Sequence, residues 1–547
     1  MTTIYKNARI FTADEESPIT EAIAVERGEI TAIGIYSEVL DSIATSENET
    51  APNEIDLQGR FMGPGFIDSH THLLSFGTAL GKAQLRDCAT LEEIRERLID
   101  WRNDHPDASR VVGISWLFDA LGEELPTAAM LDDIFPDIPV YLDANDLHSA
   151  WLNSAALKEA GISHDTPDPL GGKFERDEDG NPTGLLYETA AREYAWDFLE
   201  NRATEADLVT SLERAFSAYL ATGVTGATDM AITPPSVKGL RAILKRDGRL
   251  PFPVTGHYLM FAYDDPNKNL QQVNEVIRLR DELEETGESA WFSITGVKFI
   301  MDGVIDAKTA TMCCPYADGT NTDPIWNAES IKSVAAAVDA AGLQIAMHAI
   351  GDKTSEIAIE TLEHCAQENG LSGNQKHRIE HLESVTDETI QRMSQLGCVA
   401  SMQPVHSDPA ILDNWKAVLG DERQEEGFPW HKFRDAGVYL ALGTDAPTAP
   451  HDSLANLYIA LTGRSTIDPS LPAYHPERAF SPEQALQALT LGGAVAGRMA
   501  NVGKLAPGYQ ANFIILDRDL LNATPEEILS GKVAATIVQG ELSYGNL

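Results

Sequence analysis

The chain has 547 residues, long enough for one very large domain or for a large domain with an appendage. Hydrophobic residues make up 43% and charged residues 23%, and no apolar run of about 18 residues occurs, so a disordered chain and a membrane-spanning chain are both excluded. The 84 Asp and Glu residues exceed the 41 Lys and Arg residues to give a net charge of −43, which would repel nucleic acids and anionic membranes.

The excess of carboxylates has two interpretations. It can be a solvated surface that keeps the protein soluble in a crowded or salty cytosol, or a field that attracts cations to a site. Five cysteines, including the adjacent Cys313 and Cys314, are too few and of the wrong parity for a disulfide framework. The first residues contain no apolar stretch typical of a secretory signal. We therefore expect a cytoplasmic protein with neither a nucleic-acid nor a membrane partner.

The two ends of the chain share a strand-like pattern. Residues 4–36 alternate short β-rich runs with turn signals, which predicts a small antiparallel sheet. Near the other end, KLAPGYQANFIILD and AATIVQGELSYG are strand-like stretches joined by a short helical segment around Pro525 to Leu529. We therefore expect residues 1–62 and 497–547 to build one composite β-sandwich domain.

The chain between these ends has a β–α rhythm. From Gly223 onward, amphipathic segments alternate with the apolar runs VTGATD, PVTGHYLM, ITGVKFIMDG, LQIAMHAIGD, HRIEHLE, CVASMQP and VYLALGTD. Repeated units of this size predict a (β/α)8 barrel of the TIM type over residues 63–496. A capping box at residues 90–93 predicts an early barrel helix, and a Gly-, Pro- and Asp-rich stretch predicts an insertion at about 119–219.

Polar side chains follow several of these apolar runs. His70 and His72 are two residues apart and so point to the same side of a strand, although such a pair alone is equally consistent with two structural histidines. Four further residues lie at the C-terminal ends of other runs, where such barrels hold their active sites, and the remaining histidines show no such placement. These four are Lys298, His348, His381 and Asp445. Imidazoles and carboxylates without nearby cysteines predict a divalent metal, zinc first, with manganese, iron or nickel as alternatives.

The same segments carry a resemblance that covers essentially the whole chain. In order, they are GPGFIDSHTHL, LDANDLHSAWLNSAAL, GGKFERDEDGNPTGLLYE, VKFIMDG, MHAIGD, RIEHLE, GTDAP and GKLAPGYQANFIILDRD. The sequence resembles metal-dependent hydrolases of the amidohydrolase superfamily, in the branch of YtcJ-like proteins and N-substituted formamide deformylase. The resemblance implies that His70 and His72 bind a first ion, that His348 and His381 bind a second, and that Asp445 completes the site.

Lys298 is the position where the resemblance implies most. In two-metal relatives such a lysine reacts with CO2 to give N6-carboxylysine, a carbamate that bridges the two ions and requires a neutral, desolvated amine. The alternative is an ion pair of Lys298 with Asp302 or Asp445 around a single metal. The sequence therefore leaves one or two ions per chain open.

The implied reaction is hydrolysis of a non-peptide carbon–nitrogen bond, an amide or a formamide, by attack of a metal-activated hydroxide. Asp445 is predicted to shuttle the proton from the attacking water to the leaving nitrogen. Weaker predictions place several side chains against the substrate, with a structural role as the alternative for each. These are Trp116, His148, Asn153, Glu188 and Gln403.

Two other functions stay open at this stage. The same metal site could serve a deaminase or an ester or lactone hydrolase, because the ligands do not determine the bond that is cleaved. A catalytically inactive, amidohydrolase-like assembly protein is a third interpretation, although every expected ligand position holds a competent residue. The expected partner is a small amide-type molecule, and a homodimer is the general expectation for a soluble enzyme.

Overall fold

The computed structural model describes residues 2–14, 16–44, 51–122, 124–145, 148–169, 171–370 and 375–547. These residues divide into two compact units, one of residues 1–73 and 216–547 and the other of residues 74–215. The first unit holds the barrel and the sheets built from the chain ends, and the second has a sheet of its own. Each unit is described separately below.

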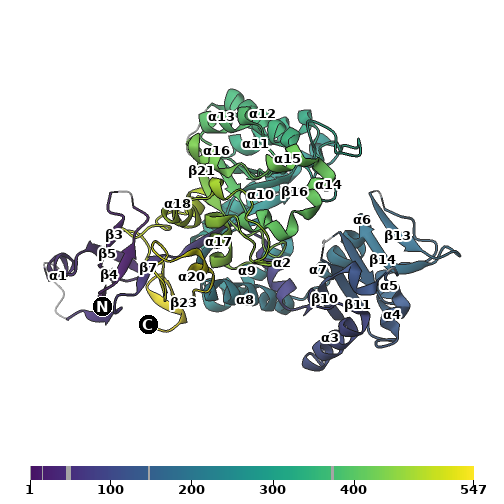
Figure 1. Ribbon diagram of the computed structural model, residues 1–547, viewed down its shortest axis with the longest axis horizontal. Helices are drawn as coiled ribbons and strands as arrows, with labels where there is room; N and C mark the ends of the chain where they lie inside the picture. Colours follow the sequence, from purple (N-terminus) through teal and green to yellow (C-terminus); the bar gives the residue numbers. More distant parts are fainter. Residues whose placement is uncertain are drawn as a thin grey trace. The chain divides into compact units, whose positions relative to one another are not determined.

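Eight parallel strands in the order β21-β20-β19-β18-β17-β16-β15-β8 form the barrel sheet, which confirms the predicted (β/α)8 class (Figure 1). Most of their residues are buried, as expected for strands covered on both faces. The strands are β8 (Phe66–Thr71), β15 (Val224–Ile232), β16 (Val254–Met260), β17 (Phe292–Ile300), β18 (Gln344–Ala349), β19 (Arg378–His381), β20 (Val399–Met402) and β21 (Tyr439–Leu442).

Helices follow the strands along the chain and pack against them, as the amphipathic pattern predicts. Buried Ile331, Val334 and Val338 lie on one face of α11, for example. The helices are α8 (Glu205–Ala221), α9 (Pro234–Asp247), α10 (Pro266–Thr286), α11 (Ala328–Ala340), α12 (Asp352–Asn369), α13 (Asp387–Leu396), α14 (Asp413–Leu419), α15 (Asp421–Glu425), α16 (Trp430–Asp435), α17 (Ser453–Thr462), α18 (Pro482–Gln487) and α19 (Gly493–Ala496).

The ring closes where the segment after β21 meets β8. The Asp445 N–H donates to the His70 carbonyl at 2.7 Å, and the His72 N–H donates to the Ala446 carbonyl at 3.0 Å. Gly443 permits this approach, because a Cβ there would lie only 2.6 Å from the His70 nitrogen. Closure therefore places Asp445 beside the two histidines of β8.

Two further sheets of the first unit combine both chain ends and confirm the predicted composite β-domain. Apolar side chains of the two sheets, among them Tyr5, Ile23, Phe513 and Ile537, share one buried cluster. One sheet contains β5 (Glu29–Gly34), β4 (Ala22–Glu26), β1 (Thr3–Lys6) and β6 (Asn53–Asp56), with α1 (Tyr36–Ala44) beside them. The other contains β24 (Glu541–Gly545), β23 (Val533–Val538), β22 (Phe513–Leu516), β7 (Phe61–Pro64), β2 (Arg9–Phe11) and β3 (Ile19–Thr20), and α20 (Pro525–Leu529) is the predicted short helix.

The second unit is larger than the insertion predicted at about 119–219, since it begins at Leu74. The helix predicted from the capping box forms, but it lies in this unit, because β10 pairs in parallel with β9 and β11 rather than with a barrel strand. A β–α rhythm does not specify which sheet a strand joins. The elements of this unit's sheet and its main helices are β13 (Gly172–Arg176), β14 (Pro182–Glu188), β12 (Ser149–Leu152), β11 (Val140–Ala144), β10 (Val111–Trp116), β9 (Ala83–Gln84), α2 (Leu73–Leu80), α3 (Leu91–Asp104), α4 (Ala128–Asp132) and α5 (Ser154–Ala160).

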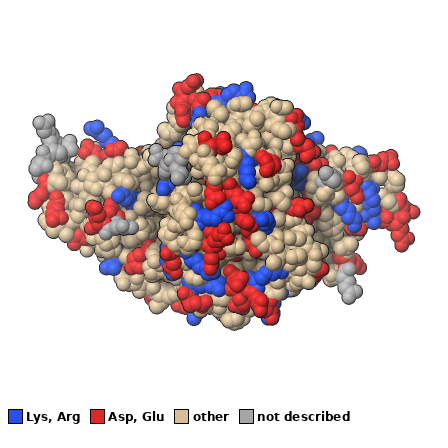
Figure 2. Space-filling view, turned by 90° about the horizontal axis from the view of Figure 1, so that it is seen from above, with Lys and Arg blue, Asp and Glu red and all other residues tan. Residues whose placement is uncertain are grey.

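Among the described residues, no helix is long and apolar enough to cross a membrane. On the face drawn in Figure 2, Asp and Glu side chains are spread widely, with Lys and Arg among them. On this face the carboxylates form no single focused patch, so their distribution fits the solvated-surface interpretation of the acidic composition.

The net charge of −43 predicts a protein that salt stabilises. Raising KCl from about 0.1 M to about 1 M shortens the Debye length from roughly 10 Å to roughly 3 Å and screens the repulsion among carboxylates. We expect the melting temperature, followed by scanning fluorimetry, to rise by several degrees over this range. Sucrose at matched osmolality is the control for nonionic effects, and an equal rise in sucrose or no rise in KCl would contradict the expectation.

Candidate metal centre

The predicted ligands gather at the C-terminal ends of the barrel strands. His70 is near the end of β8, Lys298 is near the end of β17, His348 is near the end of β18, and His381 ends β19. Asp445 follows β21 and lies beside β8 through the closure described above. Parallel strands bring these ends to one rim of the barrel, so residues far apart in the sequence meet there.

His70 and His72 both contact Asp445. The carboxylate oxygen Oδ1 of Asp445 lies 3.4 Å from His70 Nε2 and 2.9 Å from His72 Nε2. The Lys298 Nζ atom lies 3.4 Å from His70 Nε2, so the amine also belongs to this group. Burial alone would raise the pKa of Asp445, but the neighbouring His70 and His72 imidazoles hold it well below its usual range.

His381 is a buried imidazole whose ring nitrogens are unpaired. It is 3% exposed, and among the described residues neither of its ring nitrogens has a hydrogen-bond partner. Its ring centroid lies 4.9 Å from that of His70 and 4.4 Å from that of His348. Its backbone also has a positive φ of 73°, a strained conformation that a non-glycine residue adopts where the surroundings impose it. A buried imidazole with both nitrogens unpaired is a ready metal ligand.

Three histidines of this rim, His70, His348 and His381, are held in their neutral form, which is the form that binds metal. Burial and the nearby Lys298 lower the pKa of His70 to about 3 and that of His348 to about 4. Burial also lowers the pKa of His381 well below its usual range, with His348 and His70 acting in the same direction. The set His70, His381 and Asp445 offers ligand atoms within 4.8 Å of one another, so these residues fit a divalent ion.

His348 is placed differently from the other imidazoles. Its Nε2 atom lies 3.1 Å from the Gly303 carbonyl and 3.4 Å from Asp302 Oδ1. Only Nδ1 is left to contact a metal, so the role of His348 as a ligand stays a prediction. Asp302 itself is a structural carboxylate, because it accepts hydrogen bonds from the backbone N–H groups of Thr311, Ile350 and Gly351, and burial raises its pKa to about 7.

A buried ion pair behind the rim orients His70. Glu380 and Arg378 lie two residues apart on β19, are both fully buried, and pair with each other. His70 Nδ1 lies 2.7 Å from Glu380 Oε2, and because an ionised carboxylate only accepts, the Nδ1–H donates and the Nε2 lone pair faces Asp445 and Lys298. Burial opposes ionisation of Glu380, but the Arg378 charge and the His70 hydrogen bond hold its pKa well below the usual range.

Arg378 is held in turn by the barrel. Its guanidinium donates to the Ser69 carbonyl at 2.7 Å, to Ser401 Oγ at 2.7 Å and to the Ala496 carbonyl at 3.1 Å. Neither Arg378 nor Glu380 is among the residues predicted for the site, although their charges within the strand-like run HRIEHLE are a signal that could have found them.

His406 and Glu383 are two more residues that the sequence analysis missed. The expectation that the remaining histidines lack such a placement is wrong for His406, which lies just after β20 with Nε2 at 3.6 Å from Asp445 Oδ2. Its Nδ1 atom lies 3.1 Å from Glu383 Oε1. The run CVASMQP ends before His406, so the strand pattern did not point to this histidine. The turn after β20 brings it back to the rim.

Of the predicted substrate residues, Gln403 is in the barrel unit. It follows β20, is 1% exposed, and neither polar atom of its side-chain amide has a hydrogen-bond partner among the described residues. A buried amide in this state calls for a water or a ligand. Contact with the substrate is therefore still a prediction for Gln403.

The other four predicted substrate residues lie in the second unit. Asn153 caps α5 and its side chain also bonds the backbone of Phe135, Ile138 and Val140, so the capping role uses its polar atoms. Trp116 is fully buried in that unit's core and donates to the Leu142 carbonyl at 3.3 Å. His148 Nδ1 lies 3.0 Å from the Glu188 carboxylate. Substrate contact by Trp116, His148, Asn153 and Glu188 stays a prediction.

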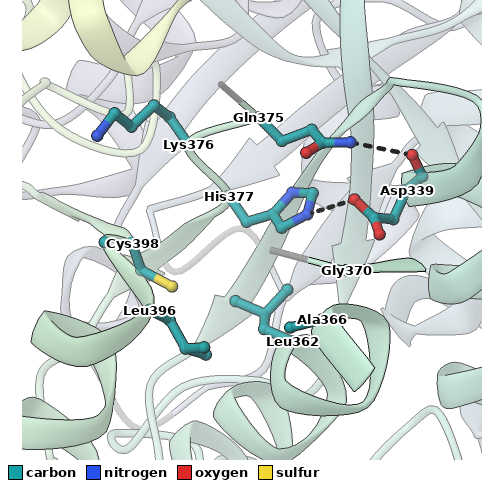
Figure 3. Close-up of a pocket in the computed structure, with 10 residues that line it drawn as sticks. Asp339, Leu362, Ala366, Gly370, Gln375, Lys376, His377, Leu396 and Cys398 are labelled. Carbon is teal, nitrogen blue, oxygen red and sulfur yellow. Dashed lines mark hydrogen bonds and ion pairs between the residues drawn. The ribbon is translucent and has the colours of Figure 1, made fainter. Parts of the chain in front are cut away.

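A pocket in the barrel unit lies away from this rim (Figure 3). Its residues include His377 and Cys398, which precede β19 and β20, so it sits at the N-terminal ends of the strands. The His377 imidazole is satisfied, since Nε2 lies 3.0 Å from Asp339 Oδ1 and Nδ1 accepts from the Ile345 N–H at 3.0 Å. That end of such a barrel serves stability, and the pocket therefore does not compete with the rim as the active site.

Comparisons with known proteins agree with this geometry. Residues 53–544 match the model of an amidohydrolase family. The chain is 31% identical to the protein LONG AFTER FAR-RED 3 of Arabidopsis thaliana over 98% of this chain and 91% of that protein. It is 27% identical to N-substituted formamide deformylase of Arthrobacter pascens over 98% of this chain and 97% of that enzyme.

A solved structure shows the same architecture. The crystal structure of an uncharacterized metal-dependent hydrolase from Pyrococcus horikoshii aligns with a TM-score of 0.79 and 26% identity. The alignment covers 96% of this chain and 99% of that one, so it includes the barrel, the composite β-domain and the second unit.

Proposed function

Since the chain belongs to the amidohydrolase family and is a metal-dependent hydrolase of that superfamily, we propose that it cleaves a non-peptide carbon–nitrogen bond of an amide or formamide. The observation that carries the proposal is the joint placement of neutral imidazoles and an ionised carboxylate at the barrel rim. The similarity to N-substituted formamide deformylase over nearly the whole chain supports formamides as the first substrates to test.

The residues that would hold the ion are His70, His381 and Asp445, with His72 and Lys298 within reach of the same group. A divalent ion bound here would supply Lewis acidity, activating a water and polarising the carbonyl of the substrate. Nitrogen and carboxylate donors without cysteine make zinc our first choice.

Asp445 is the residue we assign to proton transfer. Its carboxylate is ionised at neutral pH and reaches both histidines of the β8 end, so it can accept a proton from a water held at the rim. The same group can return that proton to the leaving nitrogen. Glu380 keeps His70 in the tautomer whose Nε2 lone pair faces the rim.

A substrate screen tests the proposal. We expect zinc-loaded protein to release amine and formate from N-substituted formamides, or amine and acid from simple amides, and to lose the activity on chelation. The matched control is His70→Ala under identical loading. Hydrolysis of lactones or esters, or deamination of cyclic amidines, with no amide or formamide turnover would contradict the proposed bond and favour the other reactions of this site.

Lys298 is expected to carry a carbamate. Its side chain is 3% exposed, and burial lowers its pKa to about 8, so more of the amine is neutral near neutral pH than in an exposed lysine. The neutral amine adds to CO2 with loss of one proton to form the carbamate. Carbon-13 NMR of protein loaded with labelled bicarbonate and zinc should show a protein-bound carbamate signal.

The control for the Lys298 experiment is the Lys298→Ala variant, in which the signal should be missing. If the wild-type spectrum lacks the carbamate signal, or if the signal persists in Lys298→Ala, Lys298 is an ion-pair residue instead.

A further inference from the structure

Gln403 is a buried polar side chain at the end of β20 that takes no part in the proposed proton transfer. It is 1% exposed, and neither Oε1 nor Nε2 has a hydrogen-bond partner among the described residues. A carboxamide offers one acceptor and two N–H donors, and leaving these groups unpaired inside a protein costs free energy. A side chain that is kept in this state indicates a group that binds it from outside the chain.

The Gln403 side chain faces the interior of the barrel, one layer nearer the rim than Ser401. The backbone at Gln403 is extended, with φ of −123° and ψ of 94°, so the two side chains point to the same side. Ser401 Oγ accepts a hydrogen bond from the Arg378 guanidinium at 2.7 Å. Arg378 in turn pairs with Glu380, the carboxylate that contacts His70. Gln403 therefore lies on the side of β20 that faces the proposed metal centre.

The turn that begins at Gln403 is tied to the strand end that leads to Asp445. The fully buried Asn456 makes this link, because its Oδ1 accepts from the Val405 N–H at 3.1 Å and its Nδ2 donates to the Gly443 carbonyl at 2.9 Å. The two strands, β20 and β21, are also paired neighbours in the barrel. Gln403 and Asp445 thus leave adjacent strands at the same rim, with one side chain fixing the spacing of the segments that carry them.

A carboxamide is recognised by a group that brings a donor and an acceptor of its own. The N–H of a substrate amide or formamide can donate to Gln403 Oε1, while a substrate oxygen can accept from Nε2. An ester or a lactone has no N–H, so it would leave Oε1 buried and unpaired beside an alkoxy oxygen. Sites that hydrogen-bond an N–H of the correct substrate reject analogues that lack it, because a buried protein group then loses its partner.

We propose that Gln403 is a specificity-determining residue that binds the amide N–H of the substrate and so selects amides and formamides with an N–H over esters and lactones of the same shape. The inference rests on the proposed function, hydrolysis of a carbon–nitrogen bond at the metal centre. It narrows the substrate class to primary and secondary amides, since tertiary amides also lack the N–H.

A matched pair of substrates tests the proposal. N-butylformamide and butyl formate differ only in the N–H or the oxygen beside the carbonyl, and their kcat/KM values are compared on the same zinc-loaded preparation. Gln403→Met keeps the approximate size of the side chain and removes its hydrogen-bonding groups. We expect the amide-to-ester ratio of kcat/KM to fall by about 10–100-fold in this variant, because only the amide loses a hydrogen bond.

Gln344→Met is the matched control. Gln344 is also fully buried in the barrel, but its Oε1 lies 2.8 Å from His257 Nε2 and its Nε2 donates to the Lys376 carbonyl. The Gln344→Met substitution should leave the amide-to-ester ratio unchanged. Melting temperatures of the substrate-free proteins give a second readout. Gln403→Met should melt above the wild type, since it removes an unpaired buried group, whereas Gln344→Met should melt below it.

An unchanged ratio in Gln403→Met, including an equal loss of both activities, would overturn the proposal, as would an equal fall of the ratio in Gln344→Met. An unchanged ratio together with a lower melting temperature in Gln403→Met would overturn it in favour of an ordered water that holds the side chain. These results leave the proposed function intact when the wild type cleaves N-butylformamide. A wild type that cleaves only butyl formate would sink both.

Discussion

Replacing Asp445 by asparagine is expected to lower kcat by about 10²–10⁴-fold, the usual contribution of a positioned proton-transfer group. Asparagine has the same shape but no charge with which to accept the proton. It also tolerates the positive φ of 60° at this position, so the backbone that closes the barrel should persist. Steady-state kinetics measure the loss of kcat. Metal content, measured on the same preparation, shows whether the ion stays bound.

The control for this variant is Asp339→Asn. Asp339 is also buried, but it pairs with His377 at the opposite end of the barrel, away from the proposed chemistry. The Asp339→Asn substitution should leave kcat unchanged. Full activity of the Asp445→Asn protein would refute the assignment of proton transfer to Asp445.

Replacing Arg378 by methionine is expected to have the largest effect on stability. The change leaves the fully buried carboxylate of Glu380 without its cation, and breaking a buried pair in this way costs about 3–5 kcal/mol. It also disturbs the residue that orients His70, so zinc affinity should fall by about 10–100-fold. Thermal unfolding of the metal-free protein and competitive zinc titration measure the two effects separately.

A second arginine gives the matched comparison. Arg392 pairs with Glu363 in the same two-pronged manner, but these side chains are 20% and 33% exposed. Arg392→Met should therefore cost only about 0–1 kcal/mol and leave zinc affinity unchanged. Equal destabilisation by the two substitutions would show that the Arg378 pair has no special role.

Much of the barrel could be predicted because its strands are short apolar runs with distinctive ends. The runs that contain Lys298, His348 and His381 are β17, β18 and β19 in the structure. The composite β-domain was also predictable, since the strand pattern appears at both chain ends. The extent of the second unit was not, because β9 and β10 obey the same β–α rhythm as a barrel and only their pairing partners reveal the separate sheet.

The rim residues were predictable to different degrees for a physical reason. A residue at the C-terminal end of a strand, such as His70 or His381, is placed by the strand itself. His406 reaches the rim through a turn after β20, and Glu383 lies beyond the end of β19, so their positions depend on loop conformation that local pattern does not encode. Arg378 and Glu380 face inward on β19, and their value lies in contacts with β8 and β20 that form only in the closed barrel.

Metal content per chain is the most direct test of the account, measured on protein purified without chelators for the wild type and His70→Ala. We expect at least one divalent ion per wild-type chain, because neutral imidazoles and the Asp445 carboxylate converge at the rim, and we expect its loss in His70→Ala. A wild-type protein that binds no ion even after supplementation, or an unchanged count in His70→Ala, would contradict the proposed metal centre.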